Sequence, residues 1–255
     1  MTIWENTSSN RSAVVTGASS GIGQATVRAL RAQGWTVFAV ARRAERLEAL
    51  AQETGAIAIP ADVSNQTDVD SLALAVAEHG GADTLINVAG GARGSDYWAD
   101  AVDEDWEFML QSNVMGTMRL TRALLPSLRK VHGTVLNLTS TAALASYEGG
   151  SGYNAAKAAQ SAMTQALRLE EVEHGIRVIE VLPGLVQTEE FSLRRLGNQQ
   201  AADNVYAGVE QPLTADDVAE VIRYAVSAPA HVNLDQIVIR PQAQAANHKL
   251  IRTGN

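Results

Sequence analysis

Short apolar segments alternate with longer amphipathic segments along the whole chain. The short segments have the length and composition of buried strands, and we predict strands at 13–16, 36–41, 56–59, 84–87, 133–139, 176–181 and 235–239. The longer segments repeat apolar residues at helical spacing, which predicts helices at 21–33, 43–53, about 66–79, about 103–129, 153–174 and 215–226. Such alternation is typical of a parallel sheet with helices on both faces. The predicted fold class is therefore α/β, with one doubly wound parallel sheet.

The ends of several helices carry recognisable signals. Gly34 ends the first helix, and Asp62-Val63-Ser64 is predicted to cap the helix after the third strand. Thr214-Ala215-Asp216-Asp217 has the pattern of a helix start. Because no repeat, low-complexity tract or Pro/Gly/Ser-rich boundary interrupts the alternation, we expect a single domain over residues 1–255.

Composition and charge narrow the function classes. The 255 residues are 46% hydrophobic and 19% charged, which is ordinary for a globular protein with a sizeable core. The net charge of −8 argues against a nucleic-acid or anionic-membrane partner. The chain has no cysteine, which excludes disulfides, thiolate catalysis and cysteine metal sites and fits a cytoplasmic location.

Signals for targeting, membrane insertion and metal binding are missing from the sequence. Residues 1–11 are polar and lack the apolar centre of a signal peptide. No apolar run approaches the ~18–20 residues that span a bilayer. The five histidines are scattered without H-E-x-x-H spacing, so no metal site is expected.

A glycine-rich turn, T-G-A-S-S-G-I-G at 16–23, lies between the first strand and the first helix. Its spacing is G-x-x-x-G-x-G rather than the G-x-G-x-x-G of ordinary dinucleotide-binding folds. Glycines there allow a tight turn and a close backbone approach to a pyrophosphate, and the helix start offers free N–H groups to an anion. The turn therefore predicts nucleotide binding, with a plain glycine-rich turn as the alternative.

The end of the second strand indicates which dinucleotide would bind. An NAD-selective enzyme usually has Asp or Glu near position 41, where it binds the ribose 2′-hydroxyl. Ala41 stands there instead, and Arg42 and Arg43 follow. Guanidinium groups bind a 2′-phosphate in bidentate fashion, so we favour NADP(H). The same arginines could instead begin a solvated helix.

Tyr153 and Lys157 are the candidate proton-transfer pair. Four residues apart on a predicted helix, they share one face. A nearby ammonium favours phenolate, and would bring the tyrosine pKa of ~10 towards neutral pH, as a general acid/base needs. The pair alone is common on helix surfaces, and its position downstream of the glycine-rich turn gives it weight.

The ordered motifs identify a family resemblance. T-G-A-S-S-G-I-G, N-V-A-G at 87–90, Asn113 in Q-S-N-V-M-G, Ser140 in N-L-T-S-T, Y-N-A-A-K at 153–157 and L-P-G-L-V at 182–186 occur in that order. Over essentially its whole length the chain resembles the short-chain dehydrogenases/reductases. The resemblance implies a Rossmann-type fold and an oxidoreductase that acts on CH–OH groups with a nicotinamide cofactor.

The resemblance also implies a role for each catalytic residue. Tyr153 would exchange the proton of the substrate hydroxyl. Lys157 would lower the Tyr153 pKa and bind the nicotinamide ribose. Ser140 would hydrogen-bond the substrate oxygen, and Asn113 would anchor a water that relays the proton. Taken singly, Ser140 and Asn113 could equally be capping or turn residues.

The cofactor contacts implied by the resemblance and by the motifs cover both halves of the dinucleotide. The expected residues are Gly17, Ser19, Ser20, Gly21, Ile22, Gly23, Arg42, Arg43, Asp62, Val63, Asn87, Ala89, Gly90, Tyr153, Lys157, Pro183, Gly184, Val186 and Thr188. Among them, Asp62 and Val63 would flank the adenine, and Thr188 would bind the carboxamide.

Three stretches resemble one branch of the superfamily, the NADP-dependent serine/3-hydroxy-acid dehydrogenases. They are L-P-G-L-V-Q-T-E-E-F-S-L-R-R-L at 182–196, L-T-A-D-D-V-A-E at 213–220 and P-A-H-V-N-L-D at 229–235. That resemblance implies a substrate lid at about 187–212 and a small 3-hydroxy acid as substrate, such as serine, allo-threonine or 3-hydroxypropionate. Arg195 matches a basic position of the branch and would bind the acid, with Arg194 as a neighbouring candidate; a solvated arginine is the alternative. Glu148 stands where the branch has a small apolar residue, and would disfavour an acid if it faced the substrate.

Two other functions remain open at the level of sequence. One is an NADPH-dependent reductase of a ketone or a 3-oxoacyl thioester. The other is a non-enzymatic nucleotide-sensing regulator, although such proteins commonly lose the active Tyr or Lys. The family resemblance further implies a homotetramer.

Overall fold

The computed structural model describes residues 11–253. Residues 1–10, where the sequence predicts no signal peptide, lie outside that part. Within residues 11–253 no helix is both long and apolar enough to cross a membrane.

A seven-stranded parallel sheet forms the centre of the molecule, in the order β3-β2-β1-β4-β5-β6-β7. The strands are β1 (Ser12–Thr16), β2 (Thr36–Ala41), β3 (Ile57–Pro60), β4 (Thr84–Asn87), β5 (Thr134–Leu138), β6 (Arg177–Pro183) and β7 (Gln236–Ile239). All seven predicted strands are therefore confirmed. The chain order reverses between β1 and β4, and in such sheets ligands bind beyond the carboxyl ends of the strands at this reversal.

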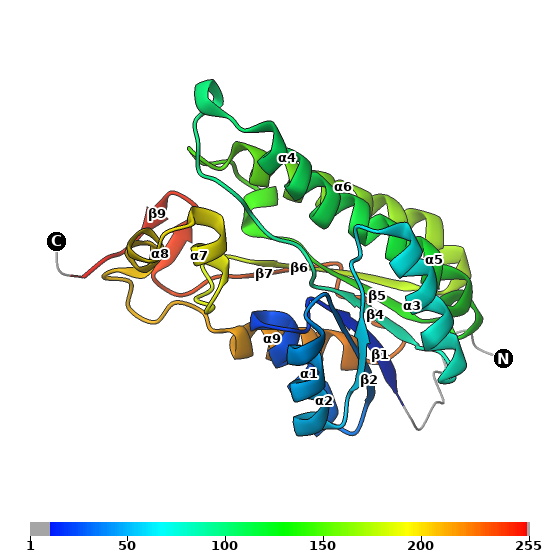
Figure 1. Cartoon of the computed structure of the whole chain (residues 1–255). Coiled ribbons are helices and arrows are strands. Elements are labelled where there is room, and N and C mark those ends of the chain that lie inside the picture. The colour runs from blue at the N-terminus through cyan, green and yellow to red at the C-terminus, as the bar shows by residue number, and fades with distance from the viewer. Residues whose placement is uncertain (1–10, 254–255) are drawn as a thin grey trace.

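Helices cover both faces of the sheet (Figure 1), as the alternating pattern predicts. One face carries α1 (Gly21–Ala32), α2 (Ala44–Thr54) and α9 (Ala215–Ser227). The other carries α3 (Gln66–Glu78), α4 (Asp103–Leu110), α5 (Gly116–Lys130) and α6 (Ser151–Glu171). Alternate strand residues serve the two cores: Val15 and Ile86 pack towards α1 and α9, whereas Val14 and Leu85 pack towards α3 and α5.

The predicted helix at about 103–129 is interrupted. α4 runs into a π-helical turn, Gln111–Met115, before α5 begins. π-helical turns inside helices are frequent at functional sites, and this one contains Asn113. The helix predicted at 153–174 begins two residues earlier and ends in a 3₁₀ turn, Val172–His174. Two further 3₁₀ turns are Trp98–Asp100 and Thr141–Ala143.

The cap predicted for α3 is corrected by the structure, and the one predicted for α9 is confirmed. Asn65 caps α3 by accepting hydrogen bonds from the backbone N–H groups of the first turn. The Asp62 carboxylate instead accepts from the backbone and hydroxyl of Ser64, so it stays outside the helix. Thr214 and Asp217 form a reciprocal capping box at the start of α9.

The segment at 187–212 contains two short helices that the hydrophobic pattern does not predict, α7 (Phe191–Leu196) and α8 (Gln199–Tyr206). The C-terminal strands β8 (Gln244–Ala246) and β9 (Lys249–Leu250) form a small antiparallel pair, also not predicted. All four elements lie together beyond one end of the sheet (Figure 1). They are too short for a periodic pattern to be recognised in the sequence.

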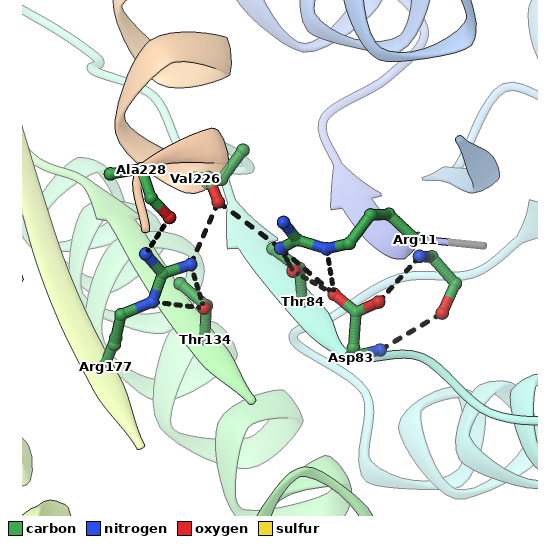
Figure 2. A network of polar contacts seen from close by, with 8 residues as sticks. Arg11, Asp83, Thr84, Thr134, Arg177, Val226 and Ala228 are labelled. Atoms are coloured by element: carbon green, nitrogen blue, oxygen red, sulfur yellow. Dashed lines mark hydrogen bonds and ion pairs between the residues drawn. The ribbon is translucent and has the colours of Figure 1, made fainter. Parts of the chain in front are cut away.

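At the opposite end of the sheet, two arginines join strand starts to the end of α9 (Figure 2). Buried Arg177 donates to the hydroxyl of Thr134 at 2.9 Å and to the carbonyls of Val226 and Ala228, both at 2.9 Å. Arg11 donates to Asp83 and to the same Val226 carbonyl. Burial lowers the pKa of Arg177 to about 10, so it stays charged at neutral pH.

Replacing Arg177 with alanine is expected to destabilise the fold by about 2–4 kcal/mol, because buried carbonyls lose their donor and a cavity forms. Urea unfolding measures the effect. Arg223→Ala serves as the control, since that residue pairs with Glu220 on the surface of α9 and is expected to cost under ~1 kcal/mol. An Arg177→Ala cost equal to that of the control would contradict the structural role of the network.

Candidate active site

A cavity of about 970 Å³ opens beyond the carboxyl ends of the strands, where the strand order reverses. Its lining comes from the glycine-rich turn, the ends of β2, β4, β5 and β6, the segment 187–212 and the C-terminal hairpin. This volume is at the upper end of what small-molecule and cofactor sites enclose. The cavity is therefore large enough for a dinucleotide and a small second ligand.

The N-terminus of α1 lies at this cavity without a side-chain cap. Ser20 occupies the cap position, but its hydroxyl accepts a hydrogen bond from Arg43 instead of from the helix. The first N–H groups of a helix have no partner within the helix, and they attract an anion. The residues present thus fit the pyrophosphate of a dinucleotide.

The glycines of the turn are required by its geometry. Gly17 and Gly21 have φ values of +68° and +52°, which a side chain rarely tolerates. A Cβ atom at Gly23 would lie 2.4 Å from the carbonyl oxygen of Gly17, so α1 could not begin so close to the strand. Thr16 also fixes the neighbouring loop, because its hydroxyl accepts from the backbone N–H groups of Val88 and Ala89, each at 2.9 Å.

Asn113 shapes the wall of the cavity from behind. It is fully buried and does not line the cavity. Its amide nitrogen donates to the carbonyls of Gly91 and Met109, both at 2.8 Å, and its oxygen accepts from the Gly91 N–H at 3.2 Å. A Cβ at Gly90 would lie 2.3 Å from that oxygen. Asn113 therefore connects the π-helical turn to the loop after β4.

Asn87 does not line the cofactor cleft, contrary to the expectation from its motif. The side chain is buried on the other side of β4, where it donates to Thr121 and to Asn137. Asn137 in turn donates to Thr164 on α6. Asn87 thus belongs to a buried network between the sheet and the helices, whereas Ala89 and Gly90 do line the cavity.

Ser140, Tyr153 and Lys157 line the same cavity. Ser140 lies just after β5, accepts from the Ala142 N–H at 3.1 Å and donates to the Pro183 carbonyl at 3.4 Å. The Lys157 ammonium donates to the Leu138 carbonyl at 3.1 Å. The three predicted side chains are therefore brought together from β5 and α6.

The pKa of Tyr153 is raised, which is the opposite of the shift expected from Lys157. Burial is the main cause and Tyr147 adds to it, whereas Ser140 and Arg195 act in the lowering direction. The Lys157 nitrogen lies 5.8 Å from the centre of the Tyr153 ring and donates to Gln160 at 2.8 Å. Burial also lowers the pKa of Lys157 to about 7, with the buried Glu180 opposing the shift.

The two arginines predicted to bind the phosphate differ in their exposure and in their contacts with the protein. Arg42 is 61% exposed and lies 3.6 Å from Asp62. Arg43 is held against the glycine-rich turn by hydrogen bonds to Ser19 and Ser20, and against the segment 187–212 by Glu190. Both line the cavity.

The other expected cofactor contacts also lie at the cavity. They are Gly17, Ser19, Ser20, Gly21, Ile22, Gly23, Asp62, Val63, Pro183, Gly184, Val186 and Thr188. The Thr188 methyl group faces Gly21, where an added Cβ would lie 3.4 Å away.

Of the expected substrate contacts, the structure places Arg195 in the cavity lining but not Glu148. Glu148 is exposed and lies outside the cavity lining. Arg195 donates to the Tyr147 hydroxyl at 3.0 Å and to the carbonyls of Gly94 and Gly149, both at 3.1 Å. Its guanidinium lies 5.8 Å from the centre of the Tyr153 ring.

Several cavity residues are missed by sequence reasoning. Phe191 on α7 stacks edge-on against Tyr153, with ring centres 5.9 Å apart. Asn247, between β8 and β9, donates to the carbonyls of Thr141 and Ala145 and so fixes the loop after Ser140. No motif marks either residue. Over residues 11–253, no cluster of three or more His, Cys, Asp or Glu side chains could hold a metal ion.

Comparison with known proteins identifies the family of the chain. The family described as short chain dehydrogenase matches residues 11–198, and the chain belongs to it. The chain is 54% identical to an uncharacterized oxidoreductase of Mycobacterium tuberculosis, over 92% of this chain and 93% of the relative. It is 40% identical to the serine 3-dehydrogenase of Agrobacterium fabrum, over 91% and 94%.

Among solved structures, the closed form of a serine dehydrogenase complexed with NADP⁺ superposes with a TM-score of 0.89. It is 34% identical in sequence, and the match covers 95% of this chain and 100% of that one. The predicted family and fold class are thus confirmed, and the predicted cofactor is the one bound by this neighbour.

The low pKa of Lys157 has a measurable consequence for stability. Its pKa is about 7 in the fold and ~10.4 in an unfolded chain, so between these values the unfolded chain binds more protons. The stability of the wild type relative to Lys157→Met should therefore rise as the pH is raised from ~7 to ~10, by at most about 1.4 kcal/mol per pH unit. Urea unfolding at several pH values measures this slope.

The exposed residue Lys130 provides the control for that series. Lys130→Met should leave the difference from wild type independent of pH. A flat difference for Lys157→Met as well would mean that its ammonium is not desolvated.

Proposed function

We propose that the protein is an NADP(H)-dependent dehydrogenase of small 3-hydroxy acids, or a reductase of the corresponding oxo acids. The main support for this proposal is that Ser140, Tyr153 and Lys157 line the same cavity as the uncapped N-terminus of α1. Arg42 and Arg43 lie at the same cavity and support NADP(H) over NAD(H). The bound cofactor would supply or accept the hydride.

The raised pKa of Tyr153 keeps its phenol protonated at neutral pH. A neutral phenol can donate its proton to the oxygen of a carbonyl as that oxygen gains charge, and in the reverse direction the tyrosine takes the proton back. The Ser140 hydroxyl would donate a hydrogen bond to the same oxygen. Lys157, held by Leu138 and Gln160, would place a positive charge near Tyr153 when it is protonated.

Arg195 supports an acidic substrate. It extends from α7 to the far side of the cavity, where Gly94 and Gly149 hold its guanidinium beside Tyr153. A carboxylate two bonds from the reacting carbon could reach this cation while its hydroxyl faces Tyr153. We propose the segment 187–212, which carries Arg195, as the substrate lid of a single domain over residues 1–255.

Assembly and location are part of the same proposal. By family resemblance we expect a cytoplasmic homotetramer without nucleic-acid or membrane partners. Light scattering on the purified protein measures the assembly directly, and a monomer would contradict the expected tetramer.

Tyr153→Phe is expected to lower turnover by at least about 100-fold, because the proton donor is lost while the ring remains. Initial rates with NADP⁺ and NAD⁺ against L-serine, allo-threonine and 3-hydroxypropionate measure the effect and rank the substrates. If the wild-type protein turns over none of the three acids, the proposal of a 3-hydroxy-acid substrate is overturned. Activity with ketones or 3-oxoacyl thioesters would then assign the reductase function.

Arg195→Gln is expected to raise KM for an acidic substrate by about tenfold or more, because a charge-assisted hydrogen bond is lost. A neutral ketone of similar size serves as the internal control, and its KM should change little. Equal changes for the acid and the neutral ketone would mean that Arg195 only holds the lid and does not recognise the carboxylate.

A further inference from the structure

Glu190 places a carboxylate against Arg43, one of the two arginines predicted to bind the 2′-phosphate of the cofactor. The residue occupies the cap position just before α7, and its side chain is only 18% exposed. One oxygen accepts from Arg43 at 2.8 Å and from Arg46 at 2.5 Å, and the other lies 2.6 Å from Arg194. Burial alone would raise the pKa of Glu190, but these arginines outweigh it and lower the pKa to about 2, so the side chain is ionised at neutral pH.

All three nitrogens of the Arg43 guanidinium donate hydrogen bonds to protein atoms. Its Nε and one terminal nitrogen donate to Ser19 and Ser20, and its other terminal nitrogen donates to Glu190. The serines belong to the glycine-rich turn, and Ser19, Ser20, Arg43 and Glu190 all line the cavity. A 2′-phosphate that is to bind Arg43 must therefore take the position of the Glu190 carboxylate or share the arginine with it.

The sequence lacks an acidic residue at position 41, and Glu190 supplies one from a segment distant in the chain. It lies 147 positions from Arg43. A carboxylate at this place accepts a hydrogen bond from a ribose 2′-hydroxyl and repels a 2′-phosphate. The phosphate is dianionic near neutral pH, so the Glu190 carboxylate would be repelled by two negative charges.

We propose that Glu190 is a specificity-determining residue that competes with the 2′-phosphate for Arg43 and thereby weakens the preference for NADP(H) over NAD(H). This rests on the proposed binding of a nicotinamide dinucleotide in the cavity. The competition also connects the cofactor to the lid, because α7 carries Phe191 against Tyr153 and Arg195 against the opposite wall. Release of Glu190 by a phosphate frees one end of α7.

The test is a binding measurement with Glu190→Gln, which keeps the shape of the side chain and removes its charge. Fluorescence titration with NADPH and with NADH gives the two dissociation constants without turnover. The Kd for NADPH is expected to fall by about tenfold, which corresponds to roughly 1.4 kcal/mol. The Kd for NADH is expected to stay unchanged or to rise. Raised salt should reduce the difference between variant and wild type.

Glu189→Gln is the matched control. It removes the same charge from the adjacent residue, which is exposed and lies outside the cavity lining, so both constants should stay at wild-type values. Glu190→Asp is a second variant that keeps the charge and shortens its reach, and it should give an intermediate ratio if the glutamine variant folds poorly.

The outcomes separate this inference from the proposed function. The proposed competition is overturned if Glu190→Gln weakens NADPH binding. It is also overturned if the ratio of the Kd for NADPH to the Kd for NADH stays within about twofold of the wild-type ratio. In either case Glu190 only orients the arginines. If wild-type protein binds neither NADPH nor NADH, the proposed function itself fails.

Discussion

The reversal of strand order between β1 and β4 is the constraint on which the rest of the site depends. The connections that leave β1 and β4 turn to opposite sides of the sheet. The loops after these two strands and the start of α1 therefore face a common space. The fixed spacing of the strands then sets the distance between the glycine-rich turn and Ser140 at the end of β5. The candidate catalytic residues and the uncapped start of α1 thus reach one cavity because of a single topological feature.

The catalytic region is stabilised by polar groups that are buried and paired. Lys157, Asn113 and Glu180 are each at most 5% exposed, and each makes hydrogen bonds to neighbouring residues. Groups of this kind are costly to bury and still more costly to leave unpaired, so they admit few alternative arrangements. Burying them lowers the stability of the fold. The network of Arg11 and Arg177 at the other end of the sheet (Figure 2) contributes stability that offsets part of this cost.

Periodicity predicts the sheet and its covering helices because a parallel strand is apolar along its whole length and an amphipathic helix repeats every 3.6 residues. It cannot predict the π-helical turn around Asn113, which is accompanied by side-chain contacts with Gly91, over twenty positions away. A motif gives the position of a residue along the chain but does not say to which side its side chain points. Asn87 belongs to a recognised motif, yet its side chain faces the helices. Glu190 is hidden in a charge-rich segment, E-E-F-S-L-R-R-L, in which only the docking of α7 decides which charges are paired.

α7 is held at both of its ends, by Glu190 against Arg43 and by Arg195 against Tyr147. The two attachments differ in kind, since one is a group of ion pairs and the other a set of hydrogen bonds from one guanidinium to backbone carbonyls and a phenol. They will therefore respond differently to the solution: ions in the medium loosen the first much more than the second. We therefore expect the Glu190 end of α7 to loosen before its Arg195 end as the ionic strength rises.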